Sequence, residues 1–493
     1  LNGLLGADQI ELLQGDLAAR LSTFSLKTDL SVTPETLTMQ GSTSLALVEL
    51  GLSQPGQNLE LGALDVNIPD LSSGPQTSVD LSATDLRATR SSAETLSLAR
   101  LNADLVLGQQ SGQPIWQPVS VAGDISLNQL DASAEGIEVA LQQLQAKLSS
   151  SSLSEVEKLA VDAGFEGMTA LQADTRMILG SGNVALNYDV ATELFELRSE
   201  LGQSELWLAD QQLKSDSIRS TVNGSLPLDF SQFSGEVGLQ SEQMSFTAPE
   251  TAHSLAALNL TSRLTTLFPT EKNPASIELL ESLVLNAQLQ GAAFDSPEIA
   301  GQIEAVALEA GLASRTGAVK VDLIIDRADL NTPEVSAKAV AYRAALEGVF
   351  GKQWQRFVGA LELQSKGAAL KASELDARWE ALSFAGPVKL QLTSDILSLP
   401  LTLRGDLGLK QLQLRAAETD LSLAGLAGSL KLNQQEALSL AGSLRIDQLN
   451  LDQNGQRARF NRAQLRPNLN FNHSLAQLDP LAVEGGVLLS LNE

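Results

Sequence analysis

The sequence predicts an all-β protein, an elongated antiparallel sheet of long bulged strands that curls along its length into a gutter, with at most a few short helices. Three observations lead to this prediction. Apolar and polar residues alternate along most of the chain, the alternation slips by one residue at recurring points, and few amphipathic helices are available to cover the resulting apolar face. Alternation with a period of two is typical of strands, because successive side chains of a strand point to opposite faces.

The stretch LSLAGSLRIDQLNLDQNG, residues 438–455, shows both the alternation and the slip. Its apolar residues occupy even positions up to Ile446 and odd positions from Leu449 onward, with Asp447 and Gln448 between them. A slip of one residue would normally turn the following side chains to the opposite face. An extra residue in a β-bulge cancels this inversion. We therefore predict a bulge at 447–448, with the apolar residues on both sides of it facing the same way.

The slip recurs along the chain, so it is a rule of construction. Related patterns surround Gly123 and Gly405, and slips without the glycine occur at 59–66, 79–88, 96–103 and 137–148. A glycine inside a strand suits a position where a side chain would crowd the neighbouring strand. The alternative interpretation, a two-residue hairpin turn at each slip, is disfavoured because the slip pairs mostly lack the glycine that such turns prefer. The sequence instead places a turn at Asn454-Gly455.

Two segments rich in helix-forming residues are candidates for short helical interruptions, 254–268 and 340–358. Apart from these, no linker or change of composition marks a domain boundary. We therefore expect residues 1–493 to form one continuous elongated β-groove segment of a longer protein. The motif GSGNVA at 180–185 imitates a nucleotide-binding loop, but strand-like patterns flank it, so a hairpin turn is expected there.

Composition excludes several classes of function. The chain has 493 residues, no cysteine and a formal net charge of −26. A surface of this charge repels phosphate backbones, so no nucleic-acid partner is expected. The absence of cysteine excludes disulfides and thiolate chemistry. The two histidines stand in separate polar contexts, and the carboxylates follow the polar face. We therefore expect no enzyme, with no catalytic residue, no metal site and no cofactor.

The apolar face suggests a ligand instead. Apolar residues make up 43% of the chain but aromatic residues only 4%, so the face is aliphatic and suits acyl chains better than sugars. We predict that the residues of the strongest repeats line this groove. The predicted lining residues are Val121, Ile125, Leu127, Leu403, Leu407, Leu409, Leu440, Leu444, Ile446, Leu449 and Leu451.

The leucine-rich, cysteine-free repeats around Gly123, Gly405 and Gly442 resemble those of the AsmA-like proteins of Gram-negative cell envelopes, and the TamB and YdbH types most of all. This resemblance implies a taco-like repeating β-groove that forms a bridge in the periplasm and conducts phospholipids between the inner and outer membranes. It also implies an inner-membrane anchor N-terminal to this segment and a lipoprotein or barrel partner in the outer membrane. The alternatives are a secreted β-solenoid of the adhesin-passenger type and an envelope scaffold without lipid transfer.

Overall fold

The computed structural model is built of β-strands. It describes residues 2–33, 38–71, 76–91, 93–108, 120–150, 158–227, 229, 231–267, 280–351, 354–373, 375–391, 400–417, 419–434, 438–471 and 483–491. The chain divides into two compact units, Leu1–Glu242 and Gln243–Glu493, and the division falls within strand β13 (Gln232–Ala248). Whether the chain is one continuous segment of a longer protein stays a prediction.

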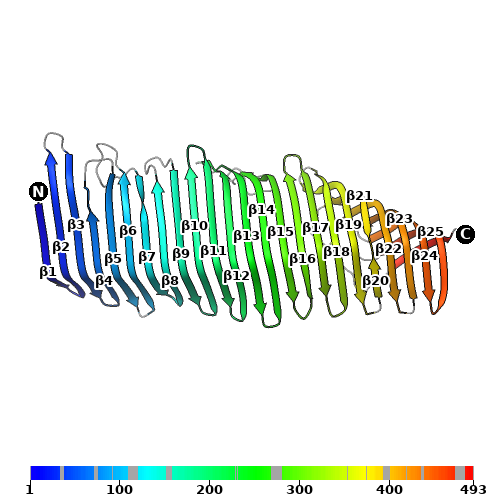
Figure 1. Ribbon diagram of the computed structural model, residues 1–493, viewed down its shortest axis with the longest axis horizontal. Helices are drawn as coiled ribbons and strands as arrows, with labels where there is room; N and C mark the ends of the chain where they lie inside the picture. The colour runs from blue at the N-terminus through cyan, green and yellow to red at the C-terminus, as the bar shows by residue number, and fades with distance from the viewer. Residues whose placement is uncertain are drawn as a thin grey trace. The chain divides into compact units, whose positions relative to one another are not determined.

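The first unit is an antiparallel meander in which each strand pairs with its neighbours in the chain (Figure 1). Its strands before β13 are β1 (Asn2–Gln14), β2 (Leu17–Thr33), β3 (Thr38–Gln54), β4 (Gln57–Ile68), β5 (Gln76–Ser91), β6 (Glu94–Gly108), β7 (Ser120–Ala134), β8 (Ile137–Ser150), β9 (Lys158–Gln172), β10 (Thr175–Asp189), β11 (Leu194–Leu208) and β12 (Gln211–Ser225).

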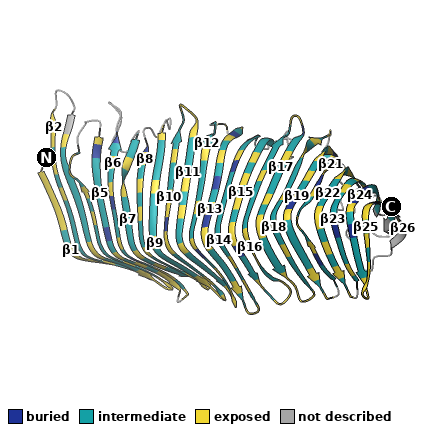
Figure 2. Ribbon diagram, turned by 45° about the vertical axis from the view of Figure 1, so that its right-hand side comes forward, coloured by how far each residue is buried: buried dark blue, intermediate teal, exposed yellow. Residues whose placement is uncertain are grey.

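The second unit follows the same plan, except that β20 and β21 together take the place of one long strand between β19 and β22. Its strands after β13 are β14 (Thr251–Leu267), β15 (Leu280–Asp295), β16 (Ala300–Ala313), β17 (Ala318–Asn331), β18 (Val335–Phe350), β19 (Arg356–Ala372), β20 (Leu375–Trp379), β21 (Leu382–Gln391), β22 (Leu401–Ala416), β23 (Thr419–Gln434), β24 (Leu438–Gln453), β25 (Gln456–Phe471) and β26 (Val483–Leu491). The prediction of an all-β fold of long antiparallel strands is confirmed, and Figure 2 shows strands that curve along their length.

The predicted helical interruption at 254–268 is wrong for the residues that the structure describes, and the one at 340–358 is wrong except for a 3₁₀ turn at Trp354, whose backbone N–H donates a hydrogen bond of 3.1 Å to the carbonyl of Gly351. Residues 254–267 lie in β14, and most of 340–358 lies in β18 and β19, while residues 268 and 352–353 are outside the described part. The slip explains the error, because it separates apolar residues such as Leu255 and Leu258 by three positions, as one face of a helix would. Helix propensity is a weak preference that tertiary context overrides, and here ladders on both sides hold the backbone extended.

The slips are matched from strand to strand. Ile446 lies opposite Leu426 and Gln448 lies opposite Ala424, so β23 and β24 keep one register on both sides of the slip. The predicted extra residue is present, but the neighbouring strand carries one too, and no strand runs two residues against one there. The facing slip pairs form a line across the strands of each unit, which we call the seam.

In both units the seam consists of one pair of consecutive residues from each strand or, between β19 and β22, from the link between β20 and β21. In the first unit it consists of residue pairs 8–9, 22–23, 48–49, 62–63, 84–85, 99–100, 128–129, 142–143, 166–167, 180–181, 202–203 and 216–217. In the second unit it consists of pairs 256–257, 290–291, 304–305, 326–327, 340–341, 366–367, 380–381, 410–411, 424–425, 447–448 and 461–462.

A left-handed residue marks the seam in every second strand of the first unit. The strands β1, β3, β5, β7, β9 and β11 carry a residue with φ between 44° and 61° there, and these residues are Gln9, Glu49, Asp85, Gln129, Gly167 and Gln203. The left-handed conformation costs a residue with a side chain about 1–2 kcal/mol. It is tolerated because the ladders on both sides determine the backbone.

Two smaller predictions are confirmed. Asn454 and Gly455, with φ of 53° and 79°, form the turn between β24 and β25. A β-carbon at Gly123 would overlap the carbonyl oxygen of Asp104 on the neighbouring strand, and one at Gly442 would lie 2.5 Å from that of Ser429. The glycines of the repeat therefore do permit a close approach of two strands. GSGNVA at 180–185, in contrast, lies inside β10 and not in a turn, because its first two residues belong to the seam.

Candidate functional site: the apolar face

The apolar face of the first unit is a set of cross-strand rows on both sides of the seam. On one side, from β1 to β12, the row consists of Ala7, Phe24, Leu47, Leu64, Ala83, Leu101, Leu127, Leu144, Phe165, Gly182, Leu201 and Ile218. On the other side it consists of Ile10, Leu21, Leu50, Leu61, Leu86, Leu98, Leu130, Leu141, Met168, Leu179, Ser204 and Ser215. Neither row contains a charged residue.

The second unit repeats the arrangement. From β14 to β25, one row beside the seam consists of Leu258, Leu289, Val306, Ile325, Tyr342, Ser365, Leu382, Leu409, Leu426, Ile446 and Ala463. The opposite row consists of Leu255, Ala292, Ile303, Ala328, Ala339, Ala368, Trp379, Leu412, Leu423, Leu449 and Phe460. Matched slips keep these rows aligned, because they shift every strand by the same amount.

The structure places all eleven predicted lining residues on this face, three in β7 of the first unit and eight in β22 and β24 of the second. Leu444, Ile446 and Leu449 are buried, with 5%, 2% and 8% of their surfaces exposed, and the other eight are half-buried. The prediction that Ile446 and Leu449 share a face is confirmed, because both belong to one buried cluster.

That cluster lies across the seam. It consists of Ile446 and Ala463 from one row and Leu423 and Leu449 from the other. Among them Ala463 is 1% exposed and Ile446 is 2% exposed. The seam residue Asp447, in contrast, keeps 61% of its side chain exposed. Side chains from the two rows therefore pack together on the apolar face, while the seam side chain lies in solvent.

The described residues contain no α-helix and no second sheet to cover this face. Half-buried residues prevail along the strands, and β1 is exposed along its length (Figure 2). An aliphatic surface that is left in water is an unfavourable arrangement, and large exposed patches mark sites of interaction. The face therefore has the character of a binding surface for apolar material.

Serine hydroxyls interrupt the apolar face in β11 to β13, which the sequence analysis did not predict. Ser199 and Ser220 face each other and share a hydrogen bond of 2.7 Å. Ser215 and Ser241 share one of 3.0 Å and are 5% and 3% exposed. A serine in an apolar position of the alternation is visible in the sequence, but its alignment with other serines depends on the register. These hydroxyls form hydrogen bonds with one another, so the sheet itself supplies hydrogen-bond partners for the polar groups on its apolar face.

His253 lies on the apolar face between two phenyl rings. Its ring centroid is 6.0 Å from that of Phe246 and 5.9 Å from that of Phe294. The placement differs from the polar context that its neighbours in the sequence suggest. His473 lies outside the described residues. Within the described ranges, no group of three or more histidine, aspartate or glutamate side chains could hold a metal ion.

The polar face carries ion pairs between neighbouring strands. Arg343 donates two hydrogen bonds to Asp322, from Nε to Oδ1 at 2.9 Å and from Nη2 to Oδ2 at 2.6 Å. These hydrogen bonds hold the pKa of Asp322 below its ordinary value of 3.8. Arg415 binds Asp420 in the same two-pronged way. Paired charges on one face and aliphatic rows on the other make the sheet strongly two-sided.

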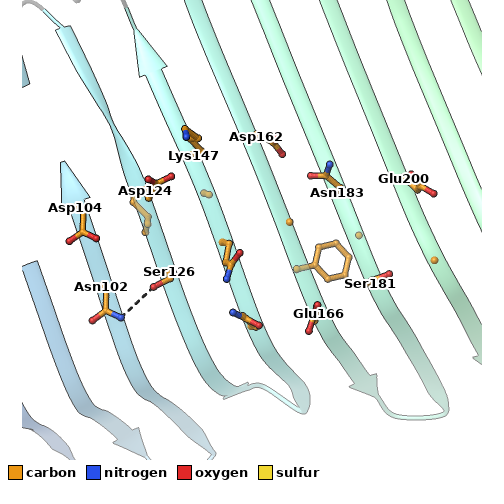
Figure 3. A pocket seen from close by; sticks show the side chains of 18 residues that line it. Asn102, Asp104, Asp124, Ser126, Lys147, Asp162, Glu166, Ser181, Asn183 and Glu200 are labelled. Carbon is orange, nitrogen blue, oxygen red and sulfur yellow. Dashed lines mark hydrogen bonds between the residues drawn. The ribbon is translucent and has the colours of Figure 1, made fainter. Parts of the chain in front are cut away.

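A hollow of about 840 Å³ lies over the polar face of β6 to β11 (Figure 3). Asp104, Asp124, Asp162, Glu166, Glu200 and Lys147 are the charged residues that line it. Asn102 donates a hydrogen bond of 3.4 Å to Ser126 at its edge. The carboxylates belong to separate strands, and the hollow arises where Gly164 and Gly202 present no side chain. It has no feature that selects a ligand.

No protein-family model matches the chain, and no curated protein is significantly similar to it. None of the described residues belongs to a helix long and apolar enough to span a membrane.

Proposed function

We propose that this chain conducts phospholipids along its apolar face, as part of a bridge between the inner and outer membranes of a Gram-negative cell envelope. The observation that carries the proposal is the pair of uncharged, mostly apolar rows that follows the seam in each unit. A buried ion costs several kcal/mol unless it is paired, so a track without charges lets an acyl chain pass each strand. The repeats that resemble AsmA-like proteins support the same function.

The geometry also suits the ligand. Neighbouring strands lie about 4.8 Å apart, so an aliphatic side chain in every strand gives nearly continuous apolar contact in the direction across the strands. No residue of the rows forms a closed site, and each contributes a small part of a shared surface. Such a surface favours sliding over tight binding. In this proposal the polar headgroup stays in water at the open side of the face.

A secreted β-solenoid passenger is the second candidate. Parallel β-helices stack successive coils, whereas every strand pair described in either unit is antiparallel. The repeating architecture alone supports a scaffold as well as a lipid conduit. An experiment that detects lipid on the apolar face distinguishes the scaffold from the conduit.

Photocrosslinking in the cell envelope tests the proposal. A photoreactive amino acid is placed at Leu409 or Leu440 on the apolar face of the full-length protein. Lys410 and Arg445, whose side chains are 65% and 75% exposed on the other face, are the matched controls. We expect phospholipid adducts at the two leucines only. Equal labelling of both faces, or no labelling at any position, would contradict lipid conduction and favour a scaffold without lipid transfer.

A second measurement separates conduction from passive lipid contact. Leu440→Asp places a carboxylate on the apolar face, whereas Ser439→Asp places one on the opposite face of the same strand. We expect Leu440→Asp to fail, and Ser439→Asp to succeed, in restoring the envelope of cells that lack the protein. If both variants complement equally well, lipid contact on this face has no role in transport.

A further inference from the structure

The Phe165 side chain occupies the space that a side chain at Gly182 would need. The two residues are direct cross-strand partners in β9 and β10, within the row beside the seam. A β-carbon at Gly182 would overlap Cε1 and Cζ of the Phe165 ring, and the third nearest atom, Cδ1 of the same ring, is 3.0 Å away. The ring therefore lies across the gap between two strands and against the backbone of β10, instead of standing up from the sheet.

A related arrangement occurs at three other phenylalanines, although the glycines covered by Phe357 and Phe384 are diagonal neighbours and not direct cross-strand partners. In each case the far edge of the ring covers a glycine of the neighbouring strand, at 2.9 Å for Phe233 over Gly224, 2.5 Å for Phe357 over Gly348 and 2.6 Å for Phe384 over Gly405, measured to the β-carbon that each glycine lacks. These three rings are 8%, 2% and 8% exposed. A ring laid over a glycine recovers the packing that the missing side chain leaves open.

Phe24, the other phenylalanine of this row, lies in its second strand, between Ala7 and Leu47. Phe165 lies well within the row, where a phenyl ring that stands upright would obstruct it. The ring is larger than the leucine and alanine side chains that make up most of the row, and a chain sliding across the strands meets each row residue in turn. The flat arrangement requires a glycine on the next strand, because any β-carbon there takes the same space.

We infer that Gly182 is a positioning residue that keeps the apolar face of the first unit passable for an acyl chain, by giving the Phe165 ring a place to lie flat. This inference rests on the proposed function. Gly182 is the best glycine to test, because its three nearest atoms all belong to the ring. At Gly405, by contrast, a β-carbon would also overlap the carbonyl oxygen of Ala385, so a substitution there would disturb the backbone as well.

The experiment combines Gly182→Ala with a photoreactive amino acid at Leu127 in β7 or at Leu201 in β11, on either side of Phe165 in the row. In the otherwise unchanged full-length protein, both positions are expected to label with phospholipid. In Gly182→Ala the displaced ring is expected to block the row between the two positions. Because lipid enters from one side only, labelling should remain at the position before the block and be lost at the position beyond it. Gly182→Ala with Phe165→Leu is expected to restore both, since the ring is gone.

Two controls make the result decisive. Gly51→Ala adds a methyl group where nothing lies within 4 Å, and it is expected to change no labelling. Phe165→Trp keeps Gly182 and introduces an indole that is larger than the space which the phenyl ring fills, so it also obstructs the row, and it tests the same idea if Gly182→Ala does not fold. Unchanged labelling in both Gly182→Ala and Phe165→Trp overturns the inference, as does failure of the double variant to restore labelling. Absence of labelling at both positions in the parent protein overturns the proposed function instead.

Discussion

Asp447 and Gly425 face each other across the ladder of β23 and β24, so closely that a β-carbon on Gly425 would lie 3.1 Å from that of Asp447. On both sides of this contact the strands keep the same register. A bulge in one strand alone would displace its apolar rows from those of the neighbour. Matched extra residues avoid this displacement, and they also place one residue of every second strand of the first unit in the left-handed conformation.

Gly425 lies in the seam with a φ of 66°, and we expect Gly425→Ala to destabilise the protein by about 1–2 kcal/mol, because a side chain strains this conformation. Gly311→Ala in β16 is the control, since nothing lies within 4 Å of the added methyl group. Denaturant unfolding followed by tryptophan fluorescence measures both. Equal losses in the two variants would contradict the strain argument.

Gln129 is left-handed, with a φ of 52°, whereas Gln143 lies in the seam pair of the next strand without this conformation. Gln129→Gly should leave the stability unchanged or raise it, because the relief of strain offsets the added freedom of the unfolded chain. Gln143→Gly should lower the stability by roughly 0.5–1 kcal/mol, as glycine does within a strand. The midpoints of urea unfolding distinguish the two outcomes. A loss of stability in Gln129→Gly as large as that in Gln143→Gly would argue against strain at Gln129.

Ile446 is 2% exposed at the centre of the cluster across the seam. We expect Ile446→Ala to cost about 2–5 kcal/mol, because it leaves a cavity among Leu423, Leu449 and Ala463. Val340 in β18 is 49% exposed, so Val340→Ala should change the stability little. Calorimetry of the two variants measures their melting temperatures. A similar decrease in both would mean that the buried cluster contributes little to the stability of the protein.

The Asp322–Arg343 pair predicts a pH dependence of stability. The pKa of Asp322 is lowered in the folded protein by hydrogen bonds from Arg343. The stabilisation is therefore fully present above the ordinary aspartate value of 3.8, and it is lost as the pH falls through the lower folded value. We expect Asp322→Asn to reduce the stability at neutral pH and to flatten its decline in acid. Unfolding curves between pH 7 and pH 2 show this, and parallel declines in both proteins would refute the assignment.

Much of this architecture could be predicted from the sequence, because it depends on relations within a single strand. The alternation determines which residues share a face, and each slip reveals where an extra residue must lie. The common face of Leu444, Ile446 and Leu449 and the turn at Asn454-Gly455 follow from these local patterns alone. They require only that side chains alternate along an extended backbone.

The tertiary structure decided what depends on pairing between strands. Whether the slip at Asp447 meets another slip is a matter of register, and the pattern of one strand carries no information on its neighbour's position. For the same reason the sequence could not reveal that Phe165 lies over Gly182 or that Ser215 meets Ser241. It also suggested helices at 254–268 and 340–358, where apolar residues three positions apart satisfy a helix as well as a slipped strand. Only the ladders on both sides, each of which satisfies the backbone groups of every second residue, resolve that ambiguity in favour of the sheet.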